Sequence, residues 1–289
     1  MADILKMLVK SRFEIVTTTA GAVSIRNNEV NEIMHNPVGP WVEANSLYID
    51  QSGLKNLLSK TDEEELVLFD VGLGAAANAL AALACAQSIS HSRPFRIISF
   101  ERDLELLHFA CEHAYRFEHF KGYENALQLI LNQGNWSDGN ISWELRQGNF
   151  LEKIETEIYK PHLIFFDPYS PKVNNEMWTL ECFKKIRAIS RAESEGGTSF
   201  YTYSQATHIR VALMRAGFFV GYGSSTGLKA ETTQAATQFQ QLKSPLAKIW
   251  FDRWEKSTLR YPYDCLESEQ KKLDDFIRSQ RTAYDLSPV

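Results

Sequence analysis

The sequence predicts an α/β fold built on a mostly parallel β-sheet, preceded by a hairpin unit. Short apolar runs that are typical of buried strands alternate with longer helical segments between residues 62 and 262. Polar or acidic residues directly follow several of these runs, at the strand ends where open α/β sheets bind their ligands. At 289 residues, with 44% hydrophobic and 23% charged residues, the chain has an ordinary globular composition.

The elements can be assigned in chain order. Residues 13–27 predict a β-hairpin that turns at Ala20 and Gly21, so we expect residues 1–61 to form an N-terminal hairpin appendage. Residues 62–262 form the alternating part, with the expected strands "LVLFD", "FRIISFE", "WELRQ", "HLIFFD", "TSFYTY" and "FFVGYG". Residues 263–289 are polar and helical, and we expect them to pack as a C-terminal tail at the edge of the sheet.

The charge balance limits the range of partners. A formal net charge of −5 and an isoelectric point of about 5.9 argue against extensive contact with nucleic-acid phosphates. Two basic stretches remain candidates for a local patch, although charge runs of this kind are more typical of solvated helix faces. They are Lys184, Lys185, Arg187 and Arg191, and the segment from Lys248 to Lys256.

The sequence favours a cytoplasmic protein. No apolar run is long enough to cross a bilayer, and the start, "MADILKMLVKSRFEI", lacks the features of a signal peptide. Cys85, Cys111, Cys182 and Cys265 form no C-x-x-C pair, and three of them fall in expected helices as small buried hydrophobes. We therefore expect neither a disulfide framework nor a zinc site.

A glycine-containing turn follows the first strand of the alternating part. In Asp70-Val71-Gly72-Leu73-Gly74, two glycines let the backbone approach a ligand, and the helix that follows offers unpaired N–H groups. The third glycine of the dinucleotide fingerprint is replaced by Ala77, and the G-K-[ST] of a phosphate-binding loop is missing. An acid before the glycines would repel a pyrophosphate and suits a cationic amino group, which points to S-adenosylmethionine.

Two further strand ends carry residues that suit this cofactor. Glu101 ends "FRIISFE", where an acid accepts hydrogen bonds from ribose hydroxyls; the alternative is an acid that only interacts with a helix dipole. After "WELRQ", Asn149 could hydrogen-bond an adenine edge and Phe150 could pack on the ring, whereas a simple turn is the alternative. Together these signals favour a class I (Rossmann-like) S-adenosylmethionine-dependent methyltransferase over a hydride-transferring enzyme.

The stretch "FFDPYSPKVNNEMW" supplies a candidate catalytic residue. Asp167 ends the fourth strand, beside the expected sulfonium methyl group, where its carboxylate could orient an acceptor amine and receive its proton. Pro168 and Pro171 restrict the turn. Tyr169 could form a wall of the pocket, and Asn174 is expected to cap the helix that follows. The alternative is that Asp167 only caps a helix or a turn.

The sequence resembles the methyltransferase that completes 5-methylaminomethyl-2-thiouridine at the wobble position of tRNA. In many bacteria this methyltransferase is the amino-terminal half of a bifunctional enzyme that is fused to an FAD oxidase. The family's acid-x-G-x-G-x-x-x-N motif is matched by Asp70, Gly72, Gly74 and Asn78. Its Asp-x-Phe-[Ser/Ala]-Pro-x-x-Asn-x-Glu-x-Trp motif is matched, with Tyr for Phe, by Asp167, Tyr169, Ser170, Pro171, Asn174, Glu176 and Trp178.

The similarity extends over residues 13–262. The N-terminal part is similar to the family's opening hairpin at Glu29, Glu32, His35, Gly39 and Glu43. Later positions agree at Thr202, Arg210, Gly217, Lys229 and Glu231. The chain has Asn149 where the family usually has Asp, which affects the adenine contact, and Ala230 where the family has an Arg that would contact phosphate or substrate.

The resemblance implies a set of site residues. The catalytic residues would be Asp167 and Tyr169. S-adenosyl-L-methionine would be bound by Asp70, Gly72, Gly74, Asn78, Glu101, Asn149, Phe150 and Asp167. The substrate would be bound by Glu43, Pro171, Asn174, Trp178 and Lys229. No metal is expected.

The resemblance also implies a reaction. The expected activity is methylation of the aminomethyl group of 5-aminomethyl-2-thiouridine in tRNA. We expect the stand-alone form without the oxidase domain, so a separate FAD-dependent oxidase is a possible partner, and no membrane is involved. Two alternatives remain open: an N-methyltransferase of a small-molecule or protein amine, and a non-catalytic relative that only binds the cofactor.

Overall fold

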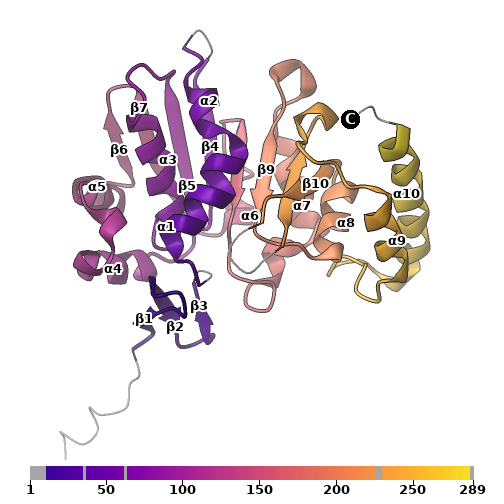
Figure 1. Ribbon diagram of the computed structural model, residues 1–289, viewed down its shortest axis with the longest axis horizontal. Coiled ribbons are helices and arrows are strands. Elements are labelled where there is room, and N and C mark those ends of the chain that lie inside the picture. The colour runs from indigo at the N-terminus through magenta and orange to yellow at the C-terminus, as the bar shows by residue number, and fades with distance from the viewer. Residues whose placement is uncertain (1–10, 35–36, 62–63, 226–229, 287–289) are drawn as a thin grey trace, which may run out of the picture.

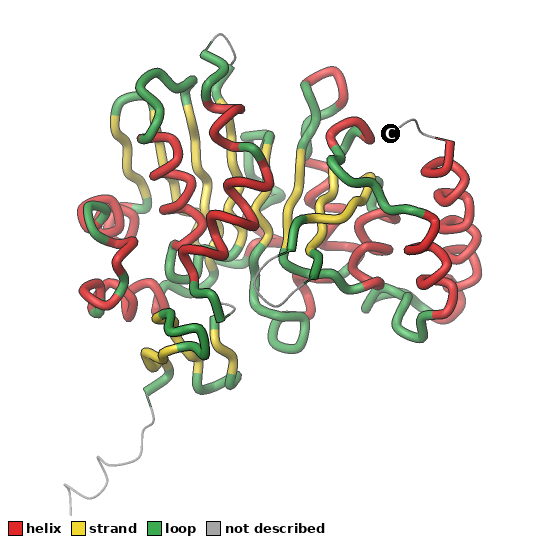
Figure 2. The backbone as a smooth tube through the Cα atoms, viewed as in Figure 1, coloured by secondary structure: helices red, strands yellow, loops and turns green. Residues whose placement is uncertain are grey.

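The computed structural model describes residues 11–34, 37–61, 64–225 and 230–286. It contains an eight-stranded sheet with helices on both faces, and a small three-stranded sheet that lies below it in the view of Figure 1. Figure 2 shows the same arrangement, with the yellow strands of the large sheet between the red helices. The predicted α/β class with a mostly parallel sheet is confirmed.

Strands and helices alternate along most of the chain. The strands are β1 (Phe13–Thr17), β2 (Val23–Asn27), β3 (Glu32–Ile33), β4 (Leu66–Val71), β5 (Phe95–Glu101), β6 (Asn135–Asp138), β7 (Ile141–Gln147), β8 (Leu163–Phe166), β9 (Ser199–Thr202), β10 (Phe219–Gly223) and β11 (Thr232–Ala236). The α-helices are α1 (Pro40–Glu43), α2 (Leu54–Leu58), α3 (Ala77–Gln87), α4 (Glu105–Glu112), α5 (Glu124–Gln133), α6 (Phe150–Lys153), α7 (Leu180–Ile189), α8 (Thr207–Arg215), α9 (Lys248–Lys256) and α10 (Glu267–Leu286). A π-helix forms η1 (Ala44–Asp50), and short 3₁₀-helices form η2 (Ala114–Arg116), η3 (Glu118–Phe120), η4 (Asn175–Trp178), η5 (Glu193–Glu195) and η6 (Phe239–Gln241).

The strand order of the large sheet is β10-β11-β9-β8-β4-β5-β7-β6. Around β4 the pairing is parallel, with β5 and β7 on one side and β8 and β9 on the other. At the two ends it is antiparallel, through β11 and β10 on one side and β6 on the other. The chain builds one side of β4 first and then crosses to the other, so the strand order reverses at β4. In such sheets the ligand binds outside the carboxyl ends of the strands at this reversal.

The central strands are buried on both faces, and their side chains alternate between two cores. In β4, Leu68 belongs to the core that includes α3 and η1, whereas Phe69 belongs to the core that includes α7 and α8. In β8, Phe165 and Phe166 divide in the same way, and all four side chains are fully buried. Burial of each such side chain contributes roughly 1.5–3 kcal/mol. This two-sided covering explains the continuous apolar runs in the sequence.

The N-terminal segment is a hairpin only in part. The predicted hairpin of residues 13–27 is confirmed, because β1 and β2 pair antiparallel and β3 extends them. Residues 40–58, however, form α1, η1 and α2, whose buried side chains share a core with α3. Leu54 and Leu58 lie one helical turn apart and are fully buried in that core. The core therefore continues across residue 61, where the sequence suggested a boundary.

Three local features differ from the sequence-based expectation. β6 and β11 were missed because polar residues and alanine dominate them, so the apolar pattern did not reveal them.

The expectation that the Asn174 side chain caps the next helix was wrong, since only the 3₁₀-helix η4 follows and the cap bond is missing. The α-helix begins later, at α7, where Thr179 accepts a hydrogen bond from the N–H of Cys182 at 3.2 Å. The helical tail expected from residue 263 is present as α10.

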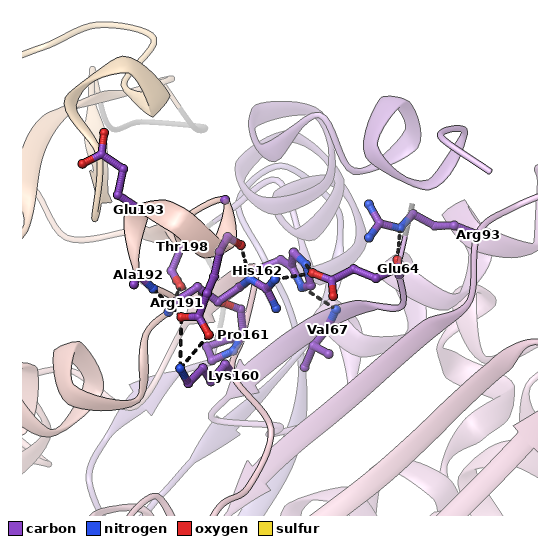
Figure 3. A network of polar contacts seen from close by, with 12 residues as sticks. Glu64, Val67, Arg93, Lys160, Pro161, His162, Arg191, Ala192, Glu193 and Thr198 are labelled. Atoms are coloured by element: carbon purple, nitrogen blue, oxygen red, sulfur yellow. Dashed lines mark hydrogen bonds and ion pairs between the residues drawn. The ribbon is translucent and has the colours of Figure 1, made fainter. Parts of the chain in front are cut away.

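At the edge opposite the carboxyl ends of the parallel strands, a polar network joins the starts of β4 and β8 (Figure 3). His162 accepts a hydrogen bond from the N–H of Val67 at 3.1 Å and contacts the Glu64 carboxylate through its other ring nitrogen at 3.3 Å. Arg191 forms an ion pair with the same carboxylate. Burial, reinforced by the positive charge of Arg191, lowers the pKa of His162 to about 4. The network therefore fixes the strand starts with a neutral imidazole.

Two absences concern only the part of the chain that the structure describes. There, no helix has both the length and the apolar character that crossing a membrane would require. The same residues hold no group of three or more His, Cys, Asp or Glu side chains that could bind a metal ion.

Candidate functional site

A cavity opens at the carboxyl ends of β4, β5, β7 and β8, and its empty space, with the open mouth included, is about 550 Å³. It lies where the strand order reverses, which is where open α/β sheets bind their ligands. The structure thus brings together residues from five separate parts of the chain. Of the predicted site residues, the lining includes Gly72, Gly74, Glu101, Asn149, Phe150, Asp167, Tyr169 and Asn174.

The two glycines of the turn between β4 and α3 contact the two acidic residues at the ends of the neighbouring strands, Asp167 and Glu101. Gly72 has a φ of +91°, and a Cβ atom there would lie 2.6 Å from the carbonyl oxygen of Asp167. Position 72 therefore requires glycine both for its backbone conformation and for the close approach of β8. The N–H of Gly74 donates a hydrogen bond to the Glu101 carboxylate at 2.9 Å.

Glu101 ends β5, and its carboxylate is fixed by backbone donors. One oxygen accepts from Gly74, and the other accepts from the N–H of Arg102 at 2.8 Å and from that of Asp103 at 3.2 Å. Burial raises the pKa of Glu101, and these backbone hydrogen bonds oppose the shift. The carboxylate thus lines the cavity at the strand end that the sequence predicted for an acid that binds ribose. The ribose contact itself remains a prediction.

Asn149 and Phe150 lie on the β7 side of the cavity. The Asn149 side-chain oxygen caps α6 by accepting a hydrogen bond from the N–H of Leu151 at 2.9 Å. The amide NH₂ group is then the polar part that remains to contact an adenine edge. Phe150 packs edge-on against Phe100, with ring centroids 5.1 Å apart. Both residues line the cavity as expected, and the adenine contact remains a prediction.

Asp167 immediately follows β8. Its N–H donates to the carbonyl of Val71 at 2.8 Å, and its carboxylate accepts a hydrogen bond from the Asn78 side chain at 2.8 Å. Burial and the nearby Glu43 carboxylate raise the pKa of Asp167 to about 8, although hydrogen bonds from Asn78 and Tyr48 oppose the shift. A carboxyl group with this pKa can gain or lose a proton near neutral pH, which suits chemistry on an amine.

Two predicted cofactor residues, Asp70 and Asn78, lie outside the cavity lining. Asp70 is fully buried because the strand pleat directs it away from the cavity, and it accepts a hydrogen bond from Ser99 at 2.7 Å. Burial raises the pKa of Asp70 to about 7. Asn78, in the first turn of α3, instead contacts Asp167. In the structure Asp70 supports the strand end and Asn78 orients Asp167. Their contacts with the cofactor remain predictions.

Tyr169 forms the cavity wall nearest the N-terminal hairpin. Its hydroxyl accepts a hydrogen bond from the Asn27 side chain at 3.1 Å, and Met34, just after β3, also lines the cavity. Trp178 is fully buried and donates its indole N–H to the carbonyl of Tyr169 at 2.9 Å. The hairpin therefore completes the cavity. Trp178, expected to bind substrate, supports this wall from within the core.

The other residues that were expected to bind substrate are dispersed. Glu43 is buried at the end of α1 and acts on Asp167 through its charge. Asn174 lines the cavity, whereas Pro171 is half-buried and lies outside the lining. Lys229 and His35 lie outside the described residues.

Three candidates for a functional role escaped the sequence-based prediction. Tyr48 and Tyr203 lie close enough to Asp167 for its charge to raise the pKa of each hydroxyl, after burial as the main cause. Arg102 pairs with Glu176, and both residues line the cavity. The tyrosines have the sequence pattern of core residues. The only signal for Arg102 was its position directly after Glu101.

Comparison with known proteins gives a match over part of the chain. A family model described as S-adenosyl-L-methionine-dependent methyltransferase matches residues 121–238. The chain is 24% identical over 236 residues to the tRNA 5-methylaminomethyl-2-thiouridine biosynthesis bifunctional protein MnmC of Campylobacter concisus, a match that covers 79% of this chain and 36% of that protein. The MnmC of Nitrosospira multiformis is 44% identical over 106 residues, which are 36% of this chain and 16% of that protein. These matches thus span 36% or less of the length of the two curated relatives.

A solved structure extends the similarity in fold to nearly the whole chain. The crystal structure of MnmC2 from Aquifex aeolicus matches with a TM-score of 0.71 at 21% sequence identity, and covers 96% of this chain and 87% of that one.

The fold and the family match define an S-adenosyl-L-methionine-dependent methyltransferase of the class I, Rossmann-like type. Its cofactor is accordingly S-adenosyl-L-methionine. Within this class, the chain resembles the methyltransferase part of the tRNA 5-methylaminomethyl-2-thiouridine biosynthesis protein, as its two motifs predicted. The roles of individual side chains remain predictions.

Proposed function

We propose that the protein transfers a methyl group from S-adenosyl-L-methionine to the aminomethyl group of 5-aminomethyl-2-thiouridine at the tRNA wobble position. The observation that carries this proposal is the placement of Asp167 in the cavity at the end of β8, where Asn78 fixes its carboxylate. An acid with a raised pKa at this position suits an amine acceptor. The name of the relatives supports the choice of nucleoside.

The residues of the cavity fit the cofactor. Three acidic residues, Glu101, Asp167 and Glu176, line the cavity with one basic residue, Arg102. This acidic excess favours a ligand that carries cationic groups and ribose hydroxyls over a ligand that carries phosphates. The glycine turn lets the backbone approach such a ligand, because a Cβ at Gly72 would meet the chain at Asp167. We propose that Gly72, Gly74, Glu101, Asn149 and Phe150 hold the cofactor. When bound, the cofactor supplies an electrophilic methyl group.

Asp167 prepares the acceptor in this proposal. An alkylammonium must lose a proton before its nitrogen lone pair can attack, and the Asp167 carboxylate receives that proton. Its hydrogen bond to the resulting amine then directs the lone pair toward the methyl group, so positioning supplies most of the rate enhancement. Tyr169 forms the adjoining wall and excludes water from the reacting atoms.

The partners in this proposal follow from the resemblance. The substrate is a tRNA that carries the unmethylated aminomethyl group, and a separate FAD-dependent oxidase would produce that group in the preceding step. Both reactions would take place in the cytoplasm. The net charge of −5 limits the number of phosphate contacts, so we propose that recognition is concentrated on the modified nucleoside.

Methyl incorporation tests the proposal. The protein is incubated with labelled S-adenosyl-L-methionine and tRNA that lacks only the terminal methyl group, beside fully modified tRNA as a control. We expect label in the first tRNA alone. An unlabelled tRNA, together with a methylated small-molecule or protein amine, would reject the tRNA substrate. Failure to bind the cofactor at millimolar concentration would reject both enzymatic readings and favour a non-catalytic relative.

A further inference from the structure

The start of the N-terminal hairpin contacts the turn that follows β5. The Nη1 atom of Arg12 donates to the carboxylates of both Asp103 and Glu105, each at 2.5 Å. Its Nε atom lies 3.0 Å from the carboxylate of Glu29, between β2 and β3. A single exposed ion pair contributes little to stability, whereas a guanidinium that three carboxylates share forms a network. Arg12 therefore joins the hairpin to the turn between β5 and α4.

The same turn supplies hydrogen bonds that fix the carboxylate of Glu101. The N–H of Asp103 donates to Glu101 at 3.2 Å, beside the N–H of Arg102 at 2.8 Å. The Asp103 carboxylate in turn accepts from the N–H of Glu105 at 2.8 Å and from Arg12. Asp103 thus holds Glu101 through its backbone and Arg12 through its side chain. Arg12 itself lies outside the cavity lining, so any effect on a ligand passes through this turn.

Apolar packing holds the hairpin in place independently of Arg12. Phe13 is buried in the core, and its ring lies 5.7 Å from that of Phe109 in α4. On the opposite side of the cavity, the Glu32 carboxylate accepts a hydrogen bond from the hydroxyl of Ser170, which follows Tyr169 in the chain. Loss of the Arg12 charge should therefore displace the turn after β5 and leave the hairpin folded.

We propose that Arg12 is a positioning residue for the cofactor, which holds Asp103 so that the Glu101 carboxylate stays oriented toward the ribose hydroxyls. Without the guanidinium, Asp103 and Glu105 lose the cation that they share. Both accept from the same nitrogen atom, so their carboxylates are close enough to repel each other and to move the turn. The inference rests on the proposed function for the contact between Glu101 and the ribose, and it does not depend on the methyl acceptor.

Arg12→Gln is the direct test, because it removes the charge and keeps a polar side chain. We expect the affinity for S-adenosylhomocysteine, measured by calorimetry, to fall about tenfold, the effect of weakening one hydrogen bond to a charged group. An analogue of this ligand that lacks the ribose hydroxyls should bind the variant and the unaltered protein equally, since Glu101 then has no hydroxyl to contact. The kcat for tRNA methylation at saturating cofactor should change less than about twofold, because Asp167 is not affected.

Arg26→Gln is the matched control. Arg26 belongs to the same hairpin and pairs with Glu14 at 2.9 Å, and its side chain is 37% exposed, compared with 33% for Arg12. This ion pair lies between β1 and β2, so its loss should leave the affinity for both ligands unchanged. Asp103→Asn weakens the contact with Arg12 from the other side. The double variant with Arg12→Gln should bind no more weakly than Arg12→Gln alone, because the two changes disrupt one contact.

The outcomes separate the inference from the proposed function. Equal affinities for Arg12→Gln and Arg26→Gln would overturn the role of Arg12. An equal loss for the ligands with and without ribose hydroxyls would also overturn it, because it would indicate a general distortion of the cavity. If Arg12→Gln does not fold, Asp103→Asn must show the loss that depends on the hydroxyls, or the inference fails. Failure of the unaltered protein to methylate tRNA would count against the proposed function alone, because the calorimetric measurement needs no methyl acceptor.

Discussion

Asp167 is placed so that a bound cation and a proton compete for one carboxyl group. Burial first, and then the Glu43 charge, raise its pKa to about 8, so in the free protein it is mostly protonated at pH 7. A sulfonium beside it favours the ionised form and lowers that pKa. The affinity for S-adenosyl-L-methionine should therefore increase severalfold between pH 7 and pH 9, with proton release on binding at the lower pH.

The dependence of cofactor affinity on the protonation of Asp167 can be measured with the reaction product, S-adenosylhomocysteine, as the control. S-adenosylhomocysteine has the same amino acid and nucleoside groups but an uncharged sulfur, so its affinity should depend less on pH. Calorimetry in two buffers of different ionisation enthalpy gives the number of protons released. Equal proton release for both ligands would contradict the assignment to Asp167, and Asp167→Asn should remove the difference between them.

The same residue should separate binding from turnover. Asp167→Asn keeps the shape of the side chain but cannot receive a proton, so we expect kcat to fall about 10²- to 10⁴-fold. Cofactor affinity at pH 7 should change little, because the native carboxyl group is mostly neutral there. Single-turnover methylation measures the expected loss of turnover, and calorimetry measures the cofactor affinity. A variant with unchanged turnover would show that Asp167 has no part in the chemistry.

Gly72 tests the close approach of β4 and β8. In Gly72→Ala the new Cβ would meet the carbonyl oxygen of Asp167 at 2.6 Å, in a backbone with a φ of +91°. We expect a loss of about 3 kcal/mol or more in the free energy of unfolding. Gly139→Ala is the control, since that glycine has a φ of +56° but no neighbouring atom within 4 Å. Its cost should be about 1 kcal/mol, measured by denaturant unfolding.

At the level of elements, the polar network at the starts of β4 and β8 makes a contribution to the free energy of unfolding that depends on pH. Burial lowers the pKa of His162 to about 4 in the folded protein, while the unfolded chain titrates near 6.5. The folded state thus binds fewer protons, and the contribution of His162 to stability is complete above pH 6.5 and is lost as the pH falls toward 4. The side chain is only 16% exposed, so the loss should be about 3 kcal/mol.

Denaturant unfolding at pH 4.5 and pH 8 measures this contribution. His162→Gln should make the difference in stability between the two pH values smaller, whereas His91→Gln, at an exposed position, should leave it unchanged. An equal effect of both substitutions would show that the network does not control this titration.

Elements differed in how well the sequence predicted them. β4, β5 and β8 have continuous apolar runs because helices cover both faces of the sheet, and this pattern was visible. β11 is equally buried, but its residues are Thr, Gln and Ala, so its burial depends on neighbouring strands and left no local signal. η1 was also missed, because α- and π-helices have similar apolar patterns.

At the scale of the whole molecule, the N-terminal segment is part of the core and of the site. Tyr48 and Leu54 are fully buried against the sheet and α3, while Asn27 and Met34 contact or line the cavity wall. A chain that begins at residue 62 should therefore lose its cooperative thermal transition and its affinity for the cofactor. A chain that begins at residue 11 is the control and should keep both. Calorimetric unfolding that is unchanged in the shorter chain would contradict a shared core.

The sequence by itself determined the first hairpin, six strands of the large sheet in their chain order, the glycine turn, and the acids at the strand ends. These features are local, since each depends on an apolar run and on the residue that follows it. Tertiary structure decided which residues meet. The strand pleat placed Asp70 outside the cavity lining, packing buried Trp178, and a π-helix brought Tyr48 against Phe165 of β8. Such contacts join residues that are far apart in the chain, so only the folded sheet could reveal them.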